Sequence, residues 1–359
     1  MIACVSHEAV ISGDVAARRF AAQLLTGRPA GSAAEVAERL LAIQGQNARA
    51  ARLTVRSRSA GLTAADVDRA LTADRSLLIT WLNRGTLHLI RSQDYWLLHR
   101  LTVRRQHERG CLRLIAAAGL TAGQAEKGVA LIGDALTAQG PLTSAQVRER
   151  LMVAGIDKAG NATLHLLMLT CQRGLAVRGP MIGAQHAYVL VADWLGAPPA
   201  IADQDAALAE LARRYLAGHG PSADRDLAKW AGLPLGKVRR GLTAISAELR
   251  DRDDDLAELA SAPEGYEPGE PAPKLLGAFD PLLLGWASRD QILGVHQQIV
   301  TVNGLFRPFA LVDGRAAGVW AWTDGQVDLQ EFTALPAAVT AALAAEARDV
   351  QRFLGAKGA

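Results

Sequence analysis

One hydrophobic pattern recurs three times along the chain at a fixed spacing. Val67, Val147 and Leu227 occupy the same position in three short helical segments, each 80 residues after the one before. Every segment opens with Gly or Pro and then a hydroxyl residue, whose oxygen can accept a hydrogen bond from the first turn of a helix. The pattern therefore predicts three copies of one small helical unit.

Strand-like runs accompany these helices. In the second copy, a turn and a second helix over residues 164–172 precede runs at 174–179 and 187–191. Helix, turn, helix and a two-stranded ribbon is the arrangement of a winged helix, whose second helix can enter a DNA groove. The third copy repeats the two helices, with the charged stretch 248–258 as its expected wing. In the first copy, residues 77–90 indicate a hairpin with a Gly-containing turn.

The pattern changes after residue 260. Residues 261–273 are rich in Pro, Gly and Glu and indicate an exposed linker. Short alternating runs then predict strands, and a helix is expected from about residue 336 to 354. We predict an α+β fold, mostly helical, with three tandem winged-helix units, a small β-barrel or sheet and a terminal helix. The expected units are 1–115, 116–197, 198–262 and 263–359.

The composition is that of an ordinary globular protein with a mild excess of positive charge. Of 359 residues, 50% are apolar and 21% are charged, and no apolar stretch is long enough to span a membrane. Residues 1–7 show no secretory signal, and Cys4, Cys111 and Cys171 have neither disulfide-framework nor zinc spacing. We expect a cytoplasmic protein without metal or cofactor. The net charge of +3 permits nucleic-acid binding but does not require it.

Basic residues cluster at three places in the chain. The clusters are Arg49, Arg52, Arg56 and Arg58; Arg100, Arg104, Arg105, Arg109 and Arg113; and Lys237, Arg239 and Arg240. Each cluster alone is as consistent with a solvated helix face as with a phosphate contact. Their recurrence at matching places in three similar units favours nucleic acid.

Two glutamines, Gln44 and Gln46, close the apolar helical run of residues 36–43. Gly45 between them is a natural point for the helix to stop. In an extended segment, residues two apart lie on the same side, so both amides are expected to face one space. There they could bind a base edge, a phosphate or a water, which are roles that a hydrophobic core does not need.

Five motifs carry a resemblance to a known family. They are LAIQGQ at 41–46, TWLNRGTLH at 80–88, RGLAVRG at 173–179, FDPLLLG at 279–285 and NGLFRP at 303–308. The chain resembles the AlkZ/YcaQ-type DNA glycosylases over nearly its whole length. The resemblance implies three winged helices and a β-barrel around a concave DNA channel. It also implies removal of bases alkylated at ring nitrogens, including bulky or crosslinked adducts.

The resemblance further implies which residues are catalytic. The family motif is glutamine, an apolar residue, then glutamine or aspartate. Gln44 and Gln46 match the two-glutamine branch, with Gly45 in place of the larger apolar residue. That branch includes enzymes that protect antibiotic producers from their own DNA-alkylating products.

Glutamine amides fit the removal of a base that is already a good leaving group. A purine alkylated at N7 is cationic, so its glycosidic bond is weakened. A glutamine oxygen can orient the attacking water and stabilise the positive sugar, whereas an amide has no useful pKa for general-base catalysis. We therefore predict hydrolysis of cationic, N7-alkylguanine-type lesions in double-stranded DNA, leaving an abasic site, and no release of uracil.

Further DNA contacts are expected from side chains in the clusters and turns. They are Arg49, Arg52, Arg84, Thr86, His88, Lys237, Arg239, Arg240 and Arg307. Two of them have structural alternatives, because His88 could anchor the hairpin and Arg307 could brace the barrel. Asp280 is expected to cap a turn, although it could face the channel, and Trp81 is expected in the core rather than as a stacking platform.

Two other functions are weighed against the glycosylase. Winged helices are commoner in regulators than in enzymes, so a non-catalytic DNA-binding regulator is the main alternative. A metallohydrolase is disfavoured because the sequence lacks His or Cys residues at metal-binding spacing. The expected protein is a bacterial, nucleoid-associated monomer whose partner is duplex DNA with alkylated purines.

Overall fold

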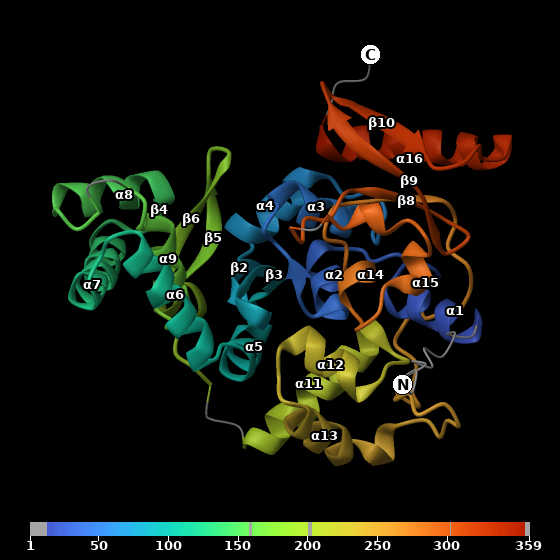
Figure 1. Cartoon of the computed structure of the whole chain (residues 1–359), viewed down its shortest axis with the longest axis horizontal. Coiled ribbons are helices and arrows are strands. Elements are labelled where there is room, and N and C mark those ends of the chain that lie inside the picture. The colour runs from blue at the N-terminus through green and yellow to red at the C-terminus, as the bar shows by residue number, and fades with distance from the viewer. Residues whose placement is uncertain (1–12, 158–159, 200–202, 302, 356–359) are drawn as a thin grey trace, which may run out of the picture.

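The structure is a computed structural model that describes residues 13–157, 160–199, 203–301 and 303–355 (Figure 1). The expectations for Cys4 and for the N-terminal signal fall outside these residues. About half of the chain is helical, and two antiparallel sheets hold the strands, so the predicted α+β class is confirmed. No described helix combines the length and the apolar character that a membrane crossing needs.

The N-terminal part combines helices with three strands. Its elements are α1 (Gly13–Ala22), α2 (Ala33–Leu40), β1 (Ile43–Gln44), α3 (Ala48–Arg56), α4 (Ala64–Thr72), β2 (Leu77–Leu82), β3 (Thr86–Arg91), α5 (Tyr95–Thr102) and α6 (Arg105–Ala117). Thr63 begins α4 as expected, because its backbone N–H and its hydroxyl both donate to the Asp66 carboxylate (2.8 and 2.7 Å). The predicted hairpin forms from β2 and β3, joined by the short helix η1 (Asn83–Gly85).

The second part repeats this organisation. Its elements are α7 (Ala122–Gln139), β4 (Leu142–Thr143), α8 (Ser144–Val153), α9 (Thr163–Gln172), β5 (Ala176–Ile182), β6 (Gln185–Leu190) and α10 (Val191–Leu195). Thr143 caps α8, accepting from the Gln146 N–H at 3.3 Å and donating its own N–H to the Gln146 amide oxygen at 2.9 Å. Ile79 of β2 pairs with Arg178 of β5, so the two hairpins join in one six-stranded sheet of order β1-β3-β2-β5-β6-β4.

The third part is helical. Its elements are α11 (Gln204–His219), α12 (Asp224–Ala231) and α13 (Leu235–Ala244). The expected turn between α12 and α13 forms at Gly232, whose φ of 67° ends α12. The expected wing at 248–258 contains no named strand, and its neighbourhood contributes the isolated bridges Ser222–Ala257 and Leu249–Leu259. The assignment of three complete winged helices therefore stays a prediction.

The C-terminal part is an open sheet and not a barrel. Its elements are β7 (Lys274–Leu276), α14 (Pro281–Leu284), α15 (Asp290–Leu293), β8 (Phe309–Val312), β9 (Arg315–Thr323), β10 (Gln326–Glu331) and α16 (Ala337–Leu354). The strand order is β10-β9-β8-β7, without closure of β7 onto β10. Alternate residues of β8 are buried on opposite faces: Phe309 packs in a core with α14 and α15, and Ala310 in a core with α16. Because helices cover both faces, the sheet of the two predicted alternatives forms, and the barrel that the resemblance implied does not.

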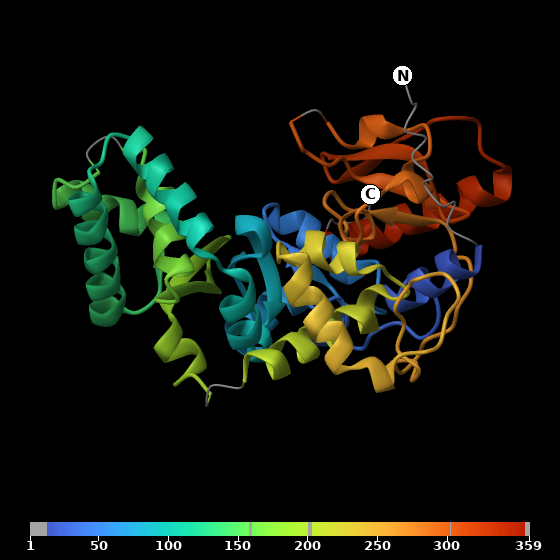
Figure 2. The same cartoon turned by 60° about the horizontal axis from the view of Figure 1, so that its bottom comes forward.

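The strands β2 and β3 lie near the centre of the molecule (Figures 1 and 2), and β1 pairs with β3. One hydrophobic core joins them to the second part through Trp81 and Leu166, which confirms the expected burial of Trp81. A second core joins them to the third part through Leu78 and Leu211. Shared cores hold the parts together, and the unit boundaries given above stay predictions.

Candidate active site

Gln44 and Gln46 lie where α2 gives way to an extended segment. The helix ends at Leu40, and Gln44 is the last residue of β1, paired with His88 of β3. The Gln44 side chain is buried, whereas Gln46 is exposed. The Gln44 amide nitrogen donates to the Gln46 amide oxygen at 2.8 Å. The two amides therefore share one space, as the spacing predicts.

Gly45 holds this segment close to β3. Its N–H donates to the Leu87 carbonyl at 2.7 Å. A Cβ built on Gly45 would lie 3.2 Å from the Leu89 nitrogen and 3.4 Å from the His88 carbonyl carbon, which is a tight approach to backbone. The glycine thus allows β1 to lie against β3, and the backbone bond fixes the glutamines on either side.

His88 is buried beside Gln44 as a neutral imidazole. Its Nδ1–H donates to the Thr86 carbonyl at 2.9 Å, since a carbonyl can only accept. Burial, followed by the charge of Arg84, lowers the pKa of His88 to about 3. Nε2 is therefore left unprotonated at neutral pH. The bond to Thr86 fits the expected anchoring of the hairpin.

A small cavity brings Gln44 and His88 together with other parts of the chain. It has a volume of about 10 Å³, and its lining residues are Ala42, Gln44, Arg84, His88, Trp230, Pro281 and Leu284. They come from the β1 segment, the hairpin, α12 and α14. A larger, open hollow of about 1040 Å³ lies on the second part and contains none of the predicted site residues. We take the small cavity as the candidate active site.

Three neighbouring cations, of which Arg84 lines the cavity, form no ion pair among the described residues. Arg84 donates to the Lys229 carbonyl at 3.0 Å, Lys229 to the Ala287 carbonyl at 2.6 Å, and Arg289 to the Leu283 carbonyl at 2.8 Å. Partial desolvation, followed by the charges of Arg289 and Arg84, lowers the pKa of the Lys229 ammonium. We name Arg84, Lys229 and Arg289 the cation cluster.

The sequence pointed to Arg84 but missed the other two members of the cation cluster. Lys229 shares α12 only with Arg225, and Arg289 has no basic residue near it in the sequence, so no local basic run marks them. Trp230 was likewise missed as a lining residue of the cavity. Only the packing of α12 and the segment after α14 against the hairpin brings these side chains to the site.

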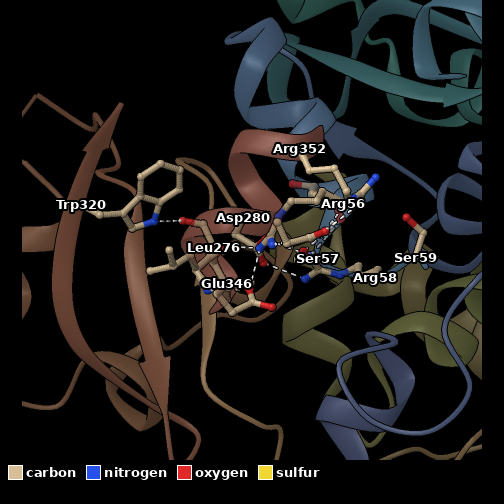
Figure 3. A network of polar contacts seen from close by, with 12 residues as sticks. Arg56, Ser57, Arg58, Ser59, Leu276, Asp280, Trp320, Glu346 and Arg352 are labelled. Atoms are coloured by element: carbon tan, nitrogen blue, oxygen red, sulfur yellow. Dashed lines mark hydrogen bonds and ion pairs between the residues drawn. The ribbon is translucent and has the colours of Figure 1, made fainter. Parts of the chain in front are cut away.

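Most of the basic cluster at residues 49–58 braces the fold. Arg52 forms an ion pair with Asp68, and Arg56 pairs with Glu346 and Asp349 at 2.8 and 3.0 Å. Arg58 and Asp280 form a fully buried pair at 2.7 Å (Figure 3). Asp280 also accepts from the Leu282 N–H, so it caps α14 as expected.

Arg49 is the exception in that cluster. It is exposed, and no described residue forms a hydrogen bond or ion pair with its side chain. These surroundings leave Arg49 available to a phosphate, whereas Arg52 would have to give up Asp68.

The remaining predicted DNA contacts lie apart from the cavity or serve local structure. On α13, Arg239 pairs with Asp224 at 2.7 Å and Arg240 pairs with Asp205. Lys237 and the exposed Arg307 form no side-chain hydrogen bond or ion pair within the described part of the chain. The Thr86 hydroxyl donates to the Asn83 carbonyl at 3.1 Å and stabilises the turn. Their DNA contacts stay predictions.

Known proteins are similar to this chain in sequence and in fold. Residues 37–353 match the family described as "DNA glycosylase AlkZ-like". The interstrand DNA cross-link repair glycosylase of Streptomyces sahachiroi is 26% identical over 370 aligned positions, covering 95% of this chain and 96% of that protein. The solved structure of the Streptomyces sahachiroi DNA glycosylase AlkZ superposes with a TM-score of 0.75 at 26% identity, over 96% of each chain. The chain therefore belongs to the AlkZ-like DNA glycosylase family.

Proposed function

We propose that this DNA glycosylase hydrolyses the N-glycosidic bond of cationic, N7-alkylguanine-type purines in duplex DNA and leaves an abasic site. Membership of the family makes the chain an N-glycosyl hydrolase and removes the alternative of a non-catalytic regulator. One observation supports the substrate class. The Gln44 amide lines a cavity whose described lining contains no carboxylate, and it is hydrogen-bonded to the Gln46 amide.

The absence of a carboxylate from that lining restricts the chemistry. Without one, the lining offers neither a strong general base nor a carboxylate nucleophile for an unactivated base. An N7-alkylated purine needs less catalytic activation, because it leaves as a neutral base once the C1′–N9 bond breaks. Gln44 and Gln46 then have to place a water below C1′ and direct amide dipoles at the positive sugar.

The size of the cavity favours lesions whose base stays outside it. A volume of about 10 Å³ is near the minimum for one water and excludes a purine. Enzymes that flip a base normally take it into a fitted pocket. We propose instead that the sugar is attacked from the cavity while the base remains unenclosed. Such a base is free to carry a bulky or crosslinked adduct, and one relative is named an interstrand cross-link repair glycosylase.

The cation cluster is the proposed anchor for the strand that carries the lesion. Within the described part of the chain its three members form no ion pair. Carbonyl groups accept hydrogen bonds from all three, and Arg289 also lies over the Phe306 ring, 5.0 Å from its centroid. Phosphate oxygens are strong acceptors for such groups and would neutralise their mutual repulsion. Arg49, Lys237 and Arg307 are proposed as outlying contacts because their side chains are also free of ion pairs among the described residues.

Excision from defined DNA tests the proposed function. Duplex DNA with a single N7-methylguanine is incubated with the protein and then treated with alkali, which cleaves abasic sites. We expect strand scission by the native protein and a loss of about 100-fold in single-turnover rate for Gln44→Ala and for Gln46→Ala. The exposed Gln93→Ala serves as the matched control and should keep full activity.

Two results would overturn the proposal. Release of uracil at a rate similar to N7-methylguanine would show that a cationic leaving group is not required. Full activity of both glutamine variants would move the reaction centre elsewhere. Binding of each variant to undamaged duplex is measured in parallel, so that lost affinity is not mistaken for lost chemistry.

A further inference from the structure

Gln44 and His88 are positioned to act on the same molecule. They face each other across β1 and β3, and opposite residues of paired strands project on one face of the sheet. Both side chains line the small cavity. Both residues are buried, with 8% and 4% of their surface exposed, so few bulk waters can form hydrogen bonds with their side chains.

The hydrogen bonds of the two side chains leave an acceptor on each. The Gln44 amide nitrogen donates to Gln46, and the Gln44 amide oxygen has no partner among the described residues. The His88 Nδ1–H is used by Thr86, and Nε2 carries a lone pair without a partner in the described part of the chain. Both acceptor atoms keep some contact with solvent, so a water can reach them.

A water in the cavity therefore meets two acceptors. We propose that His88 is a further catalytic residue, whose Nε2 and the Gln44 amide oxygen together accept both protons of the attacking water. This inference rests on the proposed glycosylase function. With both protons engaged, a lone pair of the water oxygen is left to face C1′, which is the orientation that attack requires.

The step balances without another reactant. The C1′–N9 bond breaks, and its electron pair leaves with the alkylated purine, which becomes neutral. The water oxygen forms the new bond to C1′, and one water proton moves to the His88 Nε2 and then to solvent. A weak base is sufficient, because a water bonded to an oxocarbenium carbon is strongly acidic. Burial and Arg84 keep the imidazole neutral before the reaction.

The alternative is that His88 only anchors the hairpin through Thr86. Two substitutions separate these roles. In His88→Asn the amide nitrogen reaches the place of Nδ1 and can still donate to the Thr86 carbonyl, but the acceptor at Nε2 is gone. In His88→Gln the amide reaches the place of Nε2 and offers an acceptor there, while the bond to Thr86 is lost.

Single-turnover excision of N7-methylguanine by the two variants distinguishes a catalytic role of His88 from a purely structural one. We expect His88→Asn to lose about 100-fold in rate with unchanged DNA affinity and melting temperature, and His88→Gln to recover part of that loss. Activity of His88→Asn near the native level would overturn the inference and leave the proposed function intact. Failure of the native protein to excise any N7-alkylated base would instead overturn the proposed function.

A measurement on the native protein covers the case in which both variants unfold. The ¹⁵N spectrum of histidine-labelled protein distinguishes the two neutral tautomers. We expect the His88 ring with a proton on Nδ1 and none on Nε2 between about pH 5 and pH 8. A proton on Nε2 in this range would exclude the acceptor role.

Discussion

At the scale of single residues, Gly45 sets the distance between the glutamines and β3. Because its Cβ would lie 3.2 Å from the Leu89 nitrogen, Gly45→Ala has to displace β1 by a few tenths of an ångström. We expect the excision rate to fall about 10-fold, since positioned groups act over short distances. The control is Gly133→Ala on α7, where an added Cβ meets nothing within 4 Å. Equal rates for the native protein and Gly45→Ala would show that the pair tolerates the shift.

A second single residue, His219, makes the free energy of unfolding depend on pH. It is fully buried and stacked on Tyr215 with ring centroids 4.6 Å apart, and burial lowers its pKa to about 3. An unfolded histidine titrates near pH 6.5, so its stabilising contribution is complete above that pH and is lost as the pH falls toward 3. We expect roughly 1 kcal/mol less unfolding free energy at pH 5.5 than at pH 7 from this residue. Urea denaturation of His219→Phe should show the loss reduced by that amount; an unchanged pH dependence would contradict it.

At the scale of elements, the sequence predicted what short-range chemistry determines. The helices begun by Thr63 and Thr143 form because each cap and its partner lie three residues apart. The β2–β3 hairpin also depends on local chemistry, because its two strands are joined by the short turn at Asn83–Gly85. The pairing of Ile79 with Arg178 joins elements about 100 residues apart and left no local signal. Of the two predicted alternatives, a barrel or a sheet, the sheet forms; alternation alone could not decide between them, because it does not tell whether helices cover one face of a sheet or both.

The basic cluster at residues 49–58 also has partners that are distant in sequence and could not be predicted from it. Arg58 belongs to it in sequence, yet its partner Asp280 lies in another part of the chain, and both side chains are 0% exposed. Arg58→Ala would leave a buried carboxylate unpaired, which costs about 3–5 kcal/mol. Because Asp280 caps α14, which lines the cavity, excision should fail together with stability. Arg69→Ala, which removes the ion pairs of the exposed Arg69 with Asp66 and Asp74, should cost less than about 1 kcal/mol in the same denaturation experiment.

At the scale of the whole molecule, the sequence and the structure suggest different positions for the bound DNA. A winged helix would place DNA along α13, whose Arg239 and Arg240 are held by acidic neighbours. The cation cluster would place a strand across the cavity, beside Gln44. Each lost phosphate contact lowers the dependence of log affinity on log salt by about 0.9. The double variant Lys229→Ala, Arg289→Ala should therefore lower the slope by about 2 on undamaged duplex DNA, and Arg239→Ala, Arg240→Ala should leave it unchanged. The reverse result would place the bound strand against Arg239 and Arg240 and away from Lys229 and Arg289.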